Sequence, residues 1–337
     1  MSLSSVAAPA RTRELTLGQA VNEALAEELR RDERVFVIGE DIAEAGTPFK
    51  VLSGLVEEFG PDRILDSPIS EAGITGLAVG AAMTGMRPVV DIMFGDFLTL
   101  VMDQLANQAA KAHYMSGGKL TVPLVLRTTL GATRRSAAQH SQSLQAWVAH
   151  VPGLKVVLPS TPADAKGLLK AAIRDDNPVV FIEDKLEWHV KGEVPDGEYT
   201  LPLGVGDVKR AGDDVTLVGT SSMVRVCLEA AELLAAEGIS AEVLDPRTLS
   251  PLDEELLVRS AQKTGRAIVV DEGHRSYGVT AELAAVIAER AFYHLDAPVR
   301  RLGAMDVPVP FSPPLEDETV PTPESVAQAA RALCGKT

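Results

Sequence analysis

Cysteine, basic residues and long apolar runs are all scarce in this chain. It holds 2 cysteines, Cys227 and Cys334, which lie far apart and form no Cys-x-x-Cys pair, so the sequence predicts neither a disulfide framework nor a zinc site. Lysine and arginine together number 32 against 47 acidic residues, which gives a formal net charge of −15. This balance argues against a nucleic-acid partner, because nucleic acids bind basic surfaces, but it allows a basic protein partner.

Signals for membranes and export are missing as well. The apolar run at 72–85 is too short and too interrupted by glycine to cross a bilayer, and no basic segment is dense enough to bind a membrane surface. Residues 1–13 lack the apolar core of a signal peptide. We therefore expect a cytoplasmic location and contact with neither membranes nor nucleic acid.

The motifs of several common enzyme classes are absent too. No Gly-x-Gly-x-x-Gly follows a predicted strand, so a nicotinamide or flavin fingerprint is missing. Gly117-Gly118-Lys119 lacks the first glycine and the final Ser or Thr of a phosphate-binding loop, and we interpret it as a turn. No two histidines have metal-ligand spacing, and no Gly-x-Ser-x-Gly elbow is available for a serine nucleophile.

What the chain does contain is a regular alternation of strand and helix patterns. Of its 337 residues 46% are hydrophobic, and this length favours two domains. Short apolar runs such as Val35–Ile38 are typical of strands buried on both faces. Thr16 with Gln19 forms a capping box, and Thr161 before a proline marks another helix start. The pattern predicts an α/β fold of two doubly wound, mainly parallel-sheet domains. Their predicted bounds are 15–190 and 205–337, with a linker at 191–204.

One predicted helix has an unusual composition. Ser70 could cap its start, Glu71 lies in its first turn, and the stretch up to residue 85 is small or apolar with glycines at positions 73, 76, 80 and 85. Each interior glycine costs about 1 kcal/mol against alanine, so such a helix usually exists because another backbone approaches it closely. Glu71 is then a carboxylate at the mouth of a tightly packed helix, with either a functional role or only a favourable interaction with the helix dipole.

Other chemically useful side chains follow strand ends of the same predicted sheet. Phe94 and Phe97 come after one strand, just before and within a long helix predicted from about Asp96 to Tyr114, and His140 lies in the loop after the next strand. Taken singly, Phe97 could be a core residue and His140 a solvated loop residue. Together with Glu71 they indicate a site, because parallel sheets bind ligands at the carboxyl ends of their strands.

A series of motifs, in one order and without large gaps from Thr16 to the C-terminus, resembles a known family. They include Gly39-Glu-Asp41, Ser67-Pro-Ile-Ser-Glu-Ala-Gly-Ile74, Phe94-Gly-Asp-Phe97, Asn107-Gln-Ala-Ala-Lys111, Gln139-His-Ser-Gln142 and Asp245-Pro-Arg-Thr-Leu-Ser-Pro-Leu-Asp253. In these motifs the chain resembles the β subunit of the thiamine diphosphate-dependent decarboxylating component of 2-oxo acid dehydrogenase complexes. The pyruvate, branched-chain and acetoin members of that family share them.

The resemblance implies a transketolase-like fold, with a pyrimidine-binding domain followed by a transketolase C-terminal domain. It assigns the family's catalytic glutamate to Glu71 and its active-site histidine to His140. The aromatic partner of the aminopyrimidine falls on Phe97, with Ile69 and Met93 as neighbouring cofactor contacts. A structural potassium site, mostly of backbone carbonyls, is also implied; its positions are Leu124, Ala172, Ile173, Asp175 and Asn177.

The chemistry of such a site suits these residues. The thiazolium C2 of the cofactor is weakly acidic, and a carboxylate hydrogen-bonded to the pyrimidine ring favours the imino tautomer that can take the C2 proton. Phe97 would offer a face to the pyrimidine. His140 would stabilise the oxyanion of the first adduct or serve the later acyl transfer to lipoamide, and both roles are open at this stage.

The Gly-Asp-Gly motif that holds the diphosphate and Mg²⁺ in this fold family occurs nowhere in the chain. The resemblance therefore implies half an active site, completed by an Mg²⁺-holding α subunit in an α2β2 heterotetramer. We expect pyruvate as the substrate, with acetoin or a branched-chain 2-oxo acid as alternatives, and acyl delivery to the lipoyl domain of a dihydrolipoyl acyltransferase core. A non-catalytic assembly subunit of the same fold is a further alternative, against which Glu71, Phe97 and His140 argue.

Overall fold

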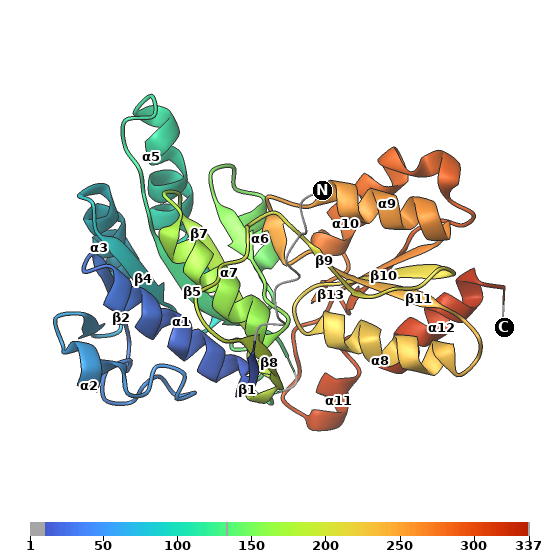
Figure 1. The fold of residues 1–337 in the computed structure, drawn as a ribbon, viewed down its shortest axis with the longest axis horizontal. Helices are drawn as coiled ribbons and strands as arrows, with labels where there is room; N and C mark the ends of the chain where they lie inside the picture. Colours follow the sequence, from blue (N-terminus) through green and yellow to red (C-terminus); the bar gives the residue numbers. More distant parts are fainter. Residues whose placement is uncertain (1–10, 133, 336–337) are drawn as a thin grey trace, which may run out of the picture.

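The computed structural model describes residues 11–132 and 134–335, which form two lobes (Figure 1). In each lobe helices cover both faces of a mainly parallel sheet, which confirms the predicted α/β fold class. Within the described residues no helix is long and apolar enough to cross a membrane. Most of the segment at 1–13, for which we predict no signal peptide, lies outside the described residues.

The first lobe is built on a seven-stranded sheet with the order β12-β6-β7-β5-β4-β2-β3. Its strands are β2 (Val35–Gly39), β3 (Ile64–Asp66), β4 (Arg87–Asp91), β5 (Val125–Leu130), β6 (Lys155–Val157), β7 (Val179–Asp184) and β12 (Thr248–Ser250). All neighbours pair in parallel except β12, which is antiparallel to β6. The carboxyl ends of β3, β2, β4 and β5 therefore meet at one edge of the sheet.

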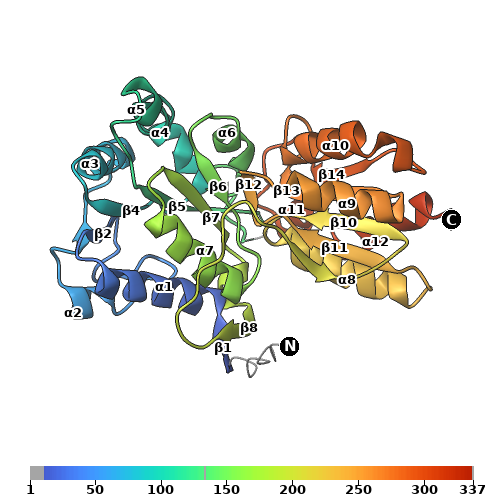
Figure 2. The same ribbon diagram turned by 45° about the horizontal axis from the view of Figure 1, so that its top comes forward.

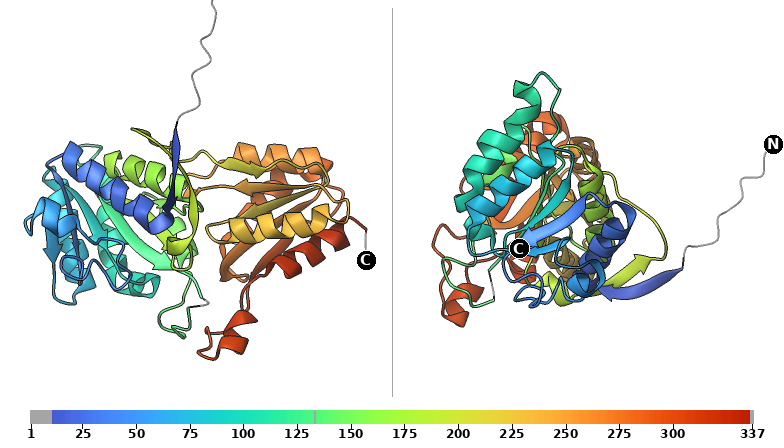
Figure 3. Two further views of the ribbon diagram at one scale, coloured as in Figure 1. Left: turned by 60° about the horizontal axis from the view of Figure 1, so that its bottom comes forward. Right: turned by 90° about the vertical axis from the view of Figure 1, so that its left-hand side faces the viewer.

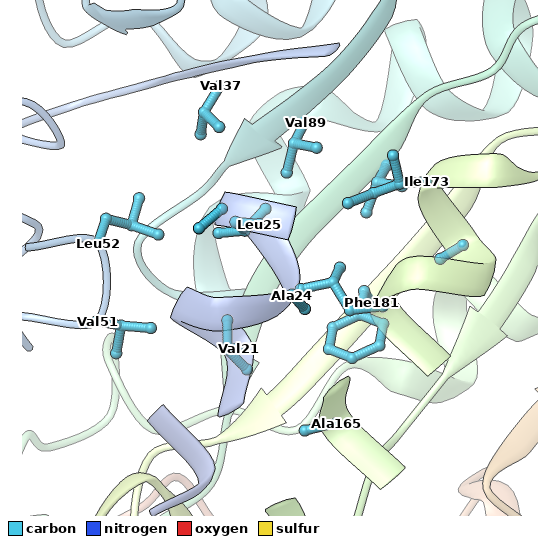
Figure 4. Packing of buried hydrophobic residues seen from close by; sticks show 14 of the residues in the cluster. Val21, Ala24, Leu25, Val37, Val51, Leu52, Val89, Ala165, Ile173 and Phe181 are labelled. Carbon is cyan, nitrogen blue, oxygen red and sulfur yellow. The ribbon is translucent and has the colours of Figure 1, made fainter. Parts of the chain in front are cut away.

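Helices cover both faces of this sheet, as Figure 2 shows. On one face lie α1 (Leu17–Arg31) and α7 (Pro162–Arg174), on the other α3 (Glu71–Met83), α4 (Leu98–Met102), α5 (Ala110–Met115) and α6 (Gln145–Ala149), with the short α2 (Leu55–Phe59) beside α1 and β3. Val37, Val89 and Phe181 of the strands pack against Val21 and Leu25 of α1 (Figure 4). Alternate strand residues face the second layer, which explains the unbroken apolar runs in the sequence.

Local sequence signals fix most helix starts but not all. The capping box at α1 is confirmed, because the Thr16 hydroxyl accepts from Gln19 N–H at 3.2 Å and Gln19 Oε1 accepts from Thr16 N–H at 2.9 Å. Thr161 caps α7 as predicted. Ser70 occupies the N-cap position of α3 as predicted, but its side chain makes no cap hydrogen bond.

The long helix predicted from about Asp96 to Tyr114 is present only in pieces. A 3₁₀ turn, η1 (Gly95–Phe97), leads into α4, then a π-helical segment, η2 (Asp103–Ala109), and then α5. Gly95 allows the first piece to approach β5 closely, because a Cβ at this position would lie 2.2 Å from the Thr129 carbonyl oxygen. The start of this region is thus set by contact with a neighbouring strand rather than by helix propensity.

The second lobe holds a five-stranded sheet with the order β14-β13-β10-β11-β9, antiparallel only at β9. Its strands are β9 (Asp207–Arg210), β10 (Val215–Gly219), β11 (Ala241–Asp245), β13 (Ala267–His274) and β14 (Arg300–Ala304). The helices α8 (Met223–Ala235) and α12 (Pro323–Leu333) cover one face, and α9 (Glu254–Thr264) and α10 (Val279–Arg290) the other. A short helix, α11 (Pro313–Asp317), projects from this lobe toward the first (Figure 3).

The boundary between the lobes is less simple than the predicted linker at 191–204. That segment begins with a strand, β8 (Lys191–Pro195), which pairs antiparallel with β1 (Thr12–Thr16) and buries Val194 completely. In addition, β12 returns from the second lobe to complete the sheet of the first. The Gly- and Pro-rich composition of this segment does not indicate a strand. β8 forms because β1, at the other end of the domain, pairs with it.

Candidate active site

Most of the predicted site residues lie at the carboxyl edge of the first sheet. His140 is in the loop after β5, Phe94 and Phe97 follow β4, Glu40 follows β2, and Glu71 opens α3 after β3. Because β5, β4, β2 and β3 are neighbours in that order, these side chains form a row along the edge. The row has an aromatic end at β5 and an acidic end at β3.

Glu71 is a buried carboxylate without a protein partner. The residue is only 8% exposed, yet its side chain has no hydrogen bond or ion pair among the residues that the structure describes. Its neighbour Glu40 accepts a hydrogen bond from the Ser70 N–H at 3.2 Å, and burial together with the Glu71 charge raises the pKa of Glu40. A buried carboxylate normally finds a donor, so Glu71 is suited to a hydrogen bond from a ligand.

Phe94 is the centre of an aromatic cluster at the other end of the row. Its ring centroid lies 4.7 Å from that of His140 and 5.7 Å from those of Phe97 and Phe49. Phe97 and His140 are 5.6 Å apart, so the structure brings these two predicted residues together. Sequence reasoning missed Phe49, because it lies in an irregular segment before α2 with no periodic pattern to mark it.

The remaining two predicted cofactor contacts differ in their surroundings. Met93 is half-buried next to Phe94, and its carbonyl accepts from the Thr129 hydroxyl at 3.2 Å. Ile69, in the turn before α3, is 82% exposed. The described residues therefore leave the Ile69 side chain uncovered, unlike a residue inside a complete binding site.

A buried ionic network lies beneath this edge, and no sequence motif indicated it. The Arg127 guanidinium on β5 pairs with Asp91 at the end of β4 and with Glu183 on β7, where its Nη2 lies 2.9 Å from Glu183 Oε2. The indole of Trp188 also donates to Glu183, at 2.6 Å. Burial raises the pKa of Asp91, although the Arg127 charge opposes this shift. The network ties three adjacent strands together directly below the candidate site.

Replacing Arg127 by methionine should destabilise the protein by about 3–5 kcal/mol, because two carboxylates would stay buried without a countercharge. The loss should shrink as the pH falls, since protonation then neutralises the stranded carboxylates. Urea unfolding of the variant and the wild type at acidic and mildly alkaline pH measures both effects. The control is Arg30→Met, which removes an exposed pair with Glu58 and should cost about 1 kcal/mol or less. Equal losses for the two variants would contradict the buried network.

Comparison with known proteins identifies the fold. A model of the transketolase pyrimidine-binding domain matches residues 13–189, and a model of the transketolase C-terminal domain matches residues 204–326. The chain is 49% identical to the acetoin:2,6-dichlorophenolindophenol oxidoreductase subunit beta of Bacillus subtilis (strain 168), over 96% of this chain and 98% of that protein. The chain belongs to the transketolase-like family of E1 β subunits.

Other similar E1 β proteins are named after different substrates. Identity is 47% with the mitochondrial pyruvate dehydrogenase E1 component subunit beta of Dictyostelium discoideum, covering 95% of this chain and 91% of the relative. It is 45% with the 2-oxoisovalerate dehydrogenase subunit beta of Bacillus subtilis (strain 168), covering 93% and 97%. A solved structure described as a split gene transketolase, inactive beta4 tetramer, aligns with a TM-score of 0.79 at 25% identity, over 95% of this chain and 98% of the other. The resemblance and the fold class inferred from the motifs are confirmed.

Membership of the E1 β family implies thiamine diphosphate as the cofactor, and the residues present fit one half of it. The Glu71 carboxylate, which has no partner among the described residues, and the half-buried ring of Phe97 suit a pyrimidine ring. The diphosphate half has no candidate, because Gly-Asp-Gly is absent from the sequence. In the described part of the chain no cluster of three or more His, Cys, Asp or Glu side chains could hold a metal ion.

The predicted potassium positions of the E1 β chain come together near the end of α7. Arg87 donates to the carbonyls of Ile173 and Asp175, at 3.0 Å each, and Lys155 pairs with the Asp175 carboxylate. Leu124 is brought close by the pairing of β5 with β7, where its carbonyl accepts from Val179 N–H at 2.8 Å. Two protein cations already contact this group, and the potassium site stays a prediction.

Proposed function

We propose that this chain is the β subunit of a thiamine diphosphate-dependent 2-oxo acid dehydrogenase, working with an α subunit in an α2β2 heterotetramer. The observation that carries the proposal is the buried Glu71, which has no side-chain partner in the described part of the chain and lies in the row with Phe97 and His140. A subunit with only a scaffolding role would have no need to bury an unpaired carboxylate, which costs stability. The missing Gly-Asp-Gly supports an α subunit that supplies the diphosphate and Mg²⁺ half of the site.

Each residue of the row has a distinct task in this scheme. When bound, thiamine diphosphate supplies the carbon nucleophile that attacks the substrate carbonyl. Glu71 exchanges a proton with the pyrimidine ring nitrogen, a role suited to a carboxyl group shielded from water. Phe97 and Met93 would hold the pyrimidine and exclude water from it. His140, at the rim, transfers a proton when the acyl group moves to the lipoyl arm of the acyltransferase partner.

Pyruvate is the substrate that we propose first, and relatives from several organisms that are named as pyruvate dehydrogenase β subunits support it. Acetoin is the second candidate. The 49% identity to an acetoin oxidoreductase subunit favours it, as does the sequence from Met93 to Phe97, which looks like that of acetoin-type members. The two differ in chemistry, because pyruvate releases CO₂ and acetoin does not. A cytoplasmic location and delivery to a lipoyl domain stay predictions.

The exposed outer face of α3 is evidence for a contact with another subunit. The sequence predicts a backbone close to its glycines, but a Cβ at Gly80 would have no neighbour within 4 Å among the described residues, and one at Gly76 would meet only Gln104. Leu77 on the same face is 54% exposed. The expected close packing is therefore absent among the residues that the structure describes, and we propose that another subunit supplies it.

Reconstitution with an α subunit that contains Gly-Asp-Gly tests the proposal. The β chain alone should show no sub-micromolar thiamine diphosphate binding by calorimetry and no turnover, whereas the assembled enzyme should release CO₂ from pyruvate. Turnover of acetoin alone would favour the second candidate, and tight cofactor binding by the lone chain would contradict the shared site. Gly80→Leu is the matched variant: a Cβ at Gly80 would meet no atom of the described residues within 4 Å, so the variant should fold normally yet weaken assembly.

A further inference from the structure

The loop that carries His140 contains two residues in an unfavourable backbone conformation. Arg135 and Ala137 adopt φ values of 60° and 61°, a left-handed region that non-glycine residues rarely occupy. Each such residue costs of the order of 1 kcal/mol and persists only where surrounding contacts impose it. Contacts outside the loop must therefore fix the position of His140.

Those contacts come from both lobes. The Ala132 N–H donates to Glu272 Oε1 on β13 at 2.5 Å, across the lobe boundary. The Lys185 ammonium, just after β7, donates to the backbone carbonyl of His140 and lies 5.4 Å from the centre of the Phe94 ring. Arg135 pairs with Glu316 of α11 at 2.7 Å, beside the loop in Figure 3.

Glu272 in turn faces a second carboxyl group. Glu272 and Asp184 are 6% and 1% exposed, and their side chains are within hydrogen-bonding distance of each other. Asp184 Oδ2 has no donor among the described residues, while Asp184 Oδ1 accepts from Leu186 N–H at 2.7 Å. Two buried carboxylate oxygens cannot face each other when both are ionised, so one proton must lie between them.

The charges around this pair are consistent with a single shared proton. The charges of both carboxyl groups and of Asp96 raise the pKa of Lys185 against the effect of its burial, and the Ser222 hydroxyl approaches Glu272 Oε2 at 3.3 Å. Arg134 lies near Lys185 and donates to its carbonyl at 3.1 Å. Burial, followed by the Asp184 charge, raises the pKa of Glu272 well above its usual value, and burial lowers the pKa of Lys185.

We propose that Glu272, Asp184 and Lys185 are positioning residues for His140: a proton shared by the two carboxyl groups, together with the Lys185 ammonium, holds residues 131–132 and 134–142 of this loop across the lobe boundary. The importance of His140 to turnover rests on the proposed function, but the effect on the loop does not. An acid whose pKa is raised on folding keeps its proton at low pH and loses it as the pH rises. The loop should accordingly loosen as the pH rises through the raised pKa of Glu272.

Isosteric amides provide the test, because each can replace the shared proton with an N–H donor. In Glu272→Gln, Oε1 can still accept from Ala132 while the amide NH₂ donates to Asp184. In Asp184→Asn, Oδ1 can still accept from Leu186 while the NH₂ donates to Glu272. In the double variant two NH₂ groups face each other without an acceptor.

Hydrogen exchange of peptides covering 131–142, measured on the full chain from about pH 6 to pH 9 and corrected for intrinsic rates, distinguishes the variants. The wild type should lose protection at high pH by roughly tenfold, each single amide variant should stay protected throughout, and the double variant should be unprotected throughout. Peptides from α12 serve as the internal control for global folding. Parallel pH curves for the wild type and both single variants, or full protection in the double variant, would overturn the proposal.

A kinetic readout separates positioning from a purely structural role. In the reconstituted enzyme, either single variant should move the high-pH fall of kcat upward while leaving KM for the 2-oxo acid nearly unchanged. Unmoved profiles would count against the proposal. If the assembled wild type turns over no substrate, the proposed function has failed, and the exchange experiment still decides the role of the carboxyl pair.

Discussion

Glu71→Gln should lower kcat of the reconstituted enzyme by roughly 10²–10⁴-fold, the range typical of a lost acid–base group. Glutamine keeps the size and a hydrogen-bond acceptor of the side chain but cannot take up a proton. The site around it should be undisturbed, because the Glu71 carboxylate makes no hydrogen bond or ion pair in the described chain that the change would break. Steady-state turnover of pyruvate, with cofactor affinity measured separately by calorimetry, gives the result.

The control for this variant is Glu57→Gln, which removes an exposed carboxylate from the first turn of α2. It should leave kcat within experimental error of the wild type. A Glu71→Gln enzyme with near-normal turnover would show that the proton passes through another group. Loss of cofactor binding without any change in kcat at saturation would instead assign Glu71 to binding alone.

His140→Ala should nearly abolish acylation of a lipoyl domain, with a loss of roughly 10²-fold or more, while dye-coupled decarboxylation continues at close to the wild-type rate. The reason is its place: His140 lies in a loop at the rim of the sheet edge, half-buried against Phe94 and Phe97, where a lipoyl arm can approach. Measuring dye reduction and lipoyl acylation on the same enzyme preparation gives both rates.

Equal losses in the two assays would instead assign His140 to an oxyanion that forms during decarboxylation. Little change in either assay would mean that the imidazole only packs against the two phenylalanine rings. His150→Ala is a suitable control, because His150 is exposed at the end of α6 and lies outside the aromatic cluster. That variant should affect neither rate.

The sequence is a good guide to this fold because its signals are local. The strand at Val35–Gly39 is buried throughout and reads as one apolar run, and Thr16 and Thr161 cap their helices through residues three positions away. Glu71, Phe97 and His140 could be placed on one edge by their positions after strands. Ser70 stands at the predicted N-cap position of α3, but its side chain makes no cap hydrogen bond, which the residue type alone does not reveal.

The parts that sequence reasoning missed depend on contacts between distant segments. Arg127 finds Asp91 and Glu183 only because β4, β5 and β7 are adjacent, an order that strand patterns do not specify. Glu272 contacts the His140 loop from 140 positions along the chain. The row of side chains along the sheet edge was therefore predictable from the sequence. The ionic network of Arg127 and the carboxyl pair beside the His140 loop were not.

The return of β12 to the first sheet has a consequence for synthesis on the ribosome. Residues 248–250 emerge only after β9, β10 and β11 have been made, so the first lobe must wait with the edge of β6 uncovered. An unpaired strand edge is a template for pairing with other chains, which makes this interval the point of greatest risk of aggregation. A nascent chain stalled near residue 240, with the first lobe emerged except for β12, should recruit chaperones more strongly than one stalled beyond residue 290, by which point the emerged residues include β12.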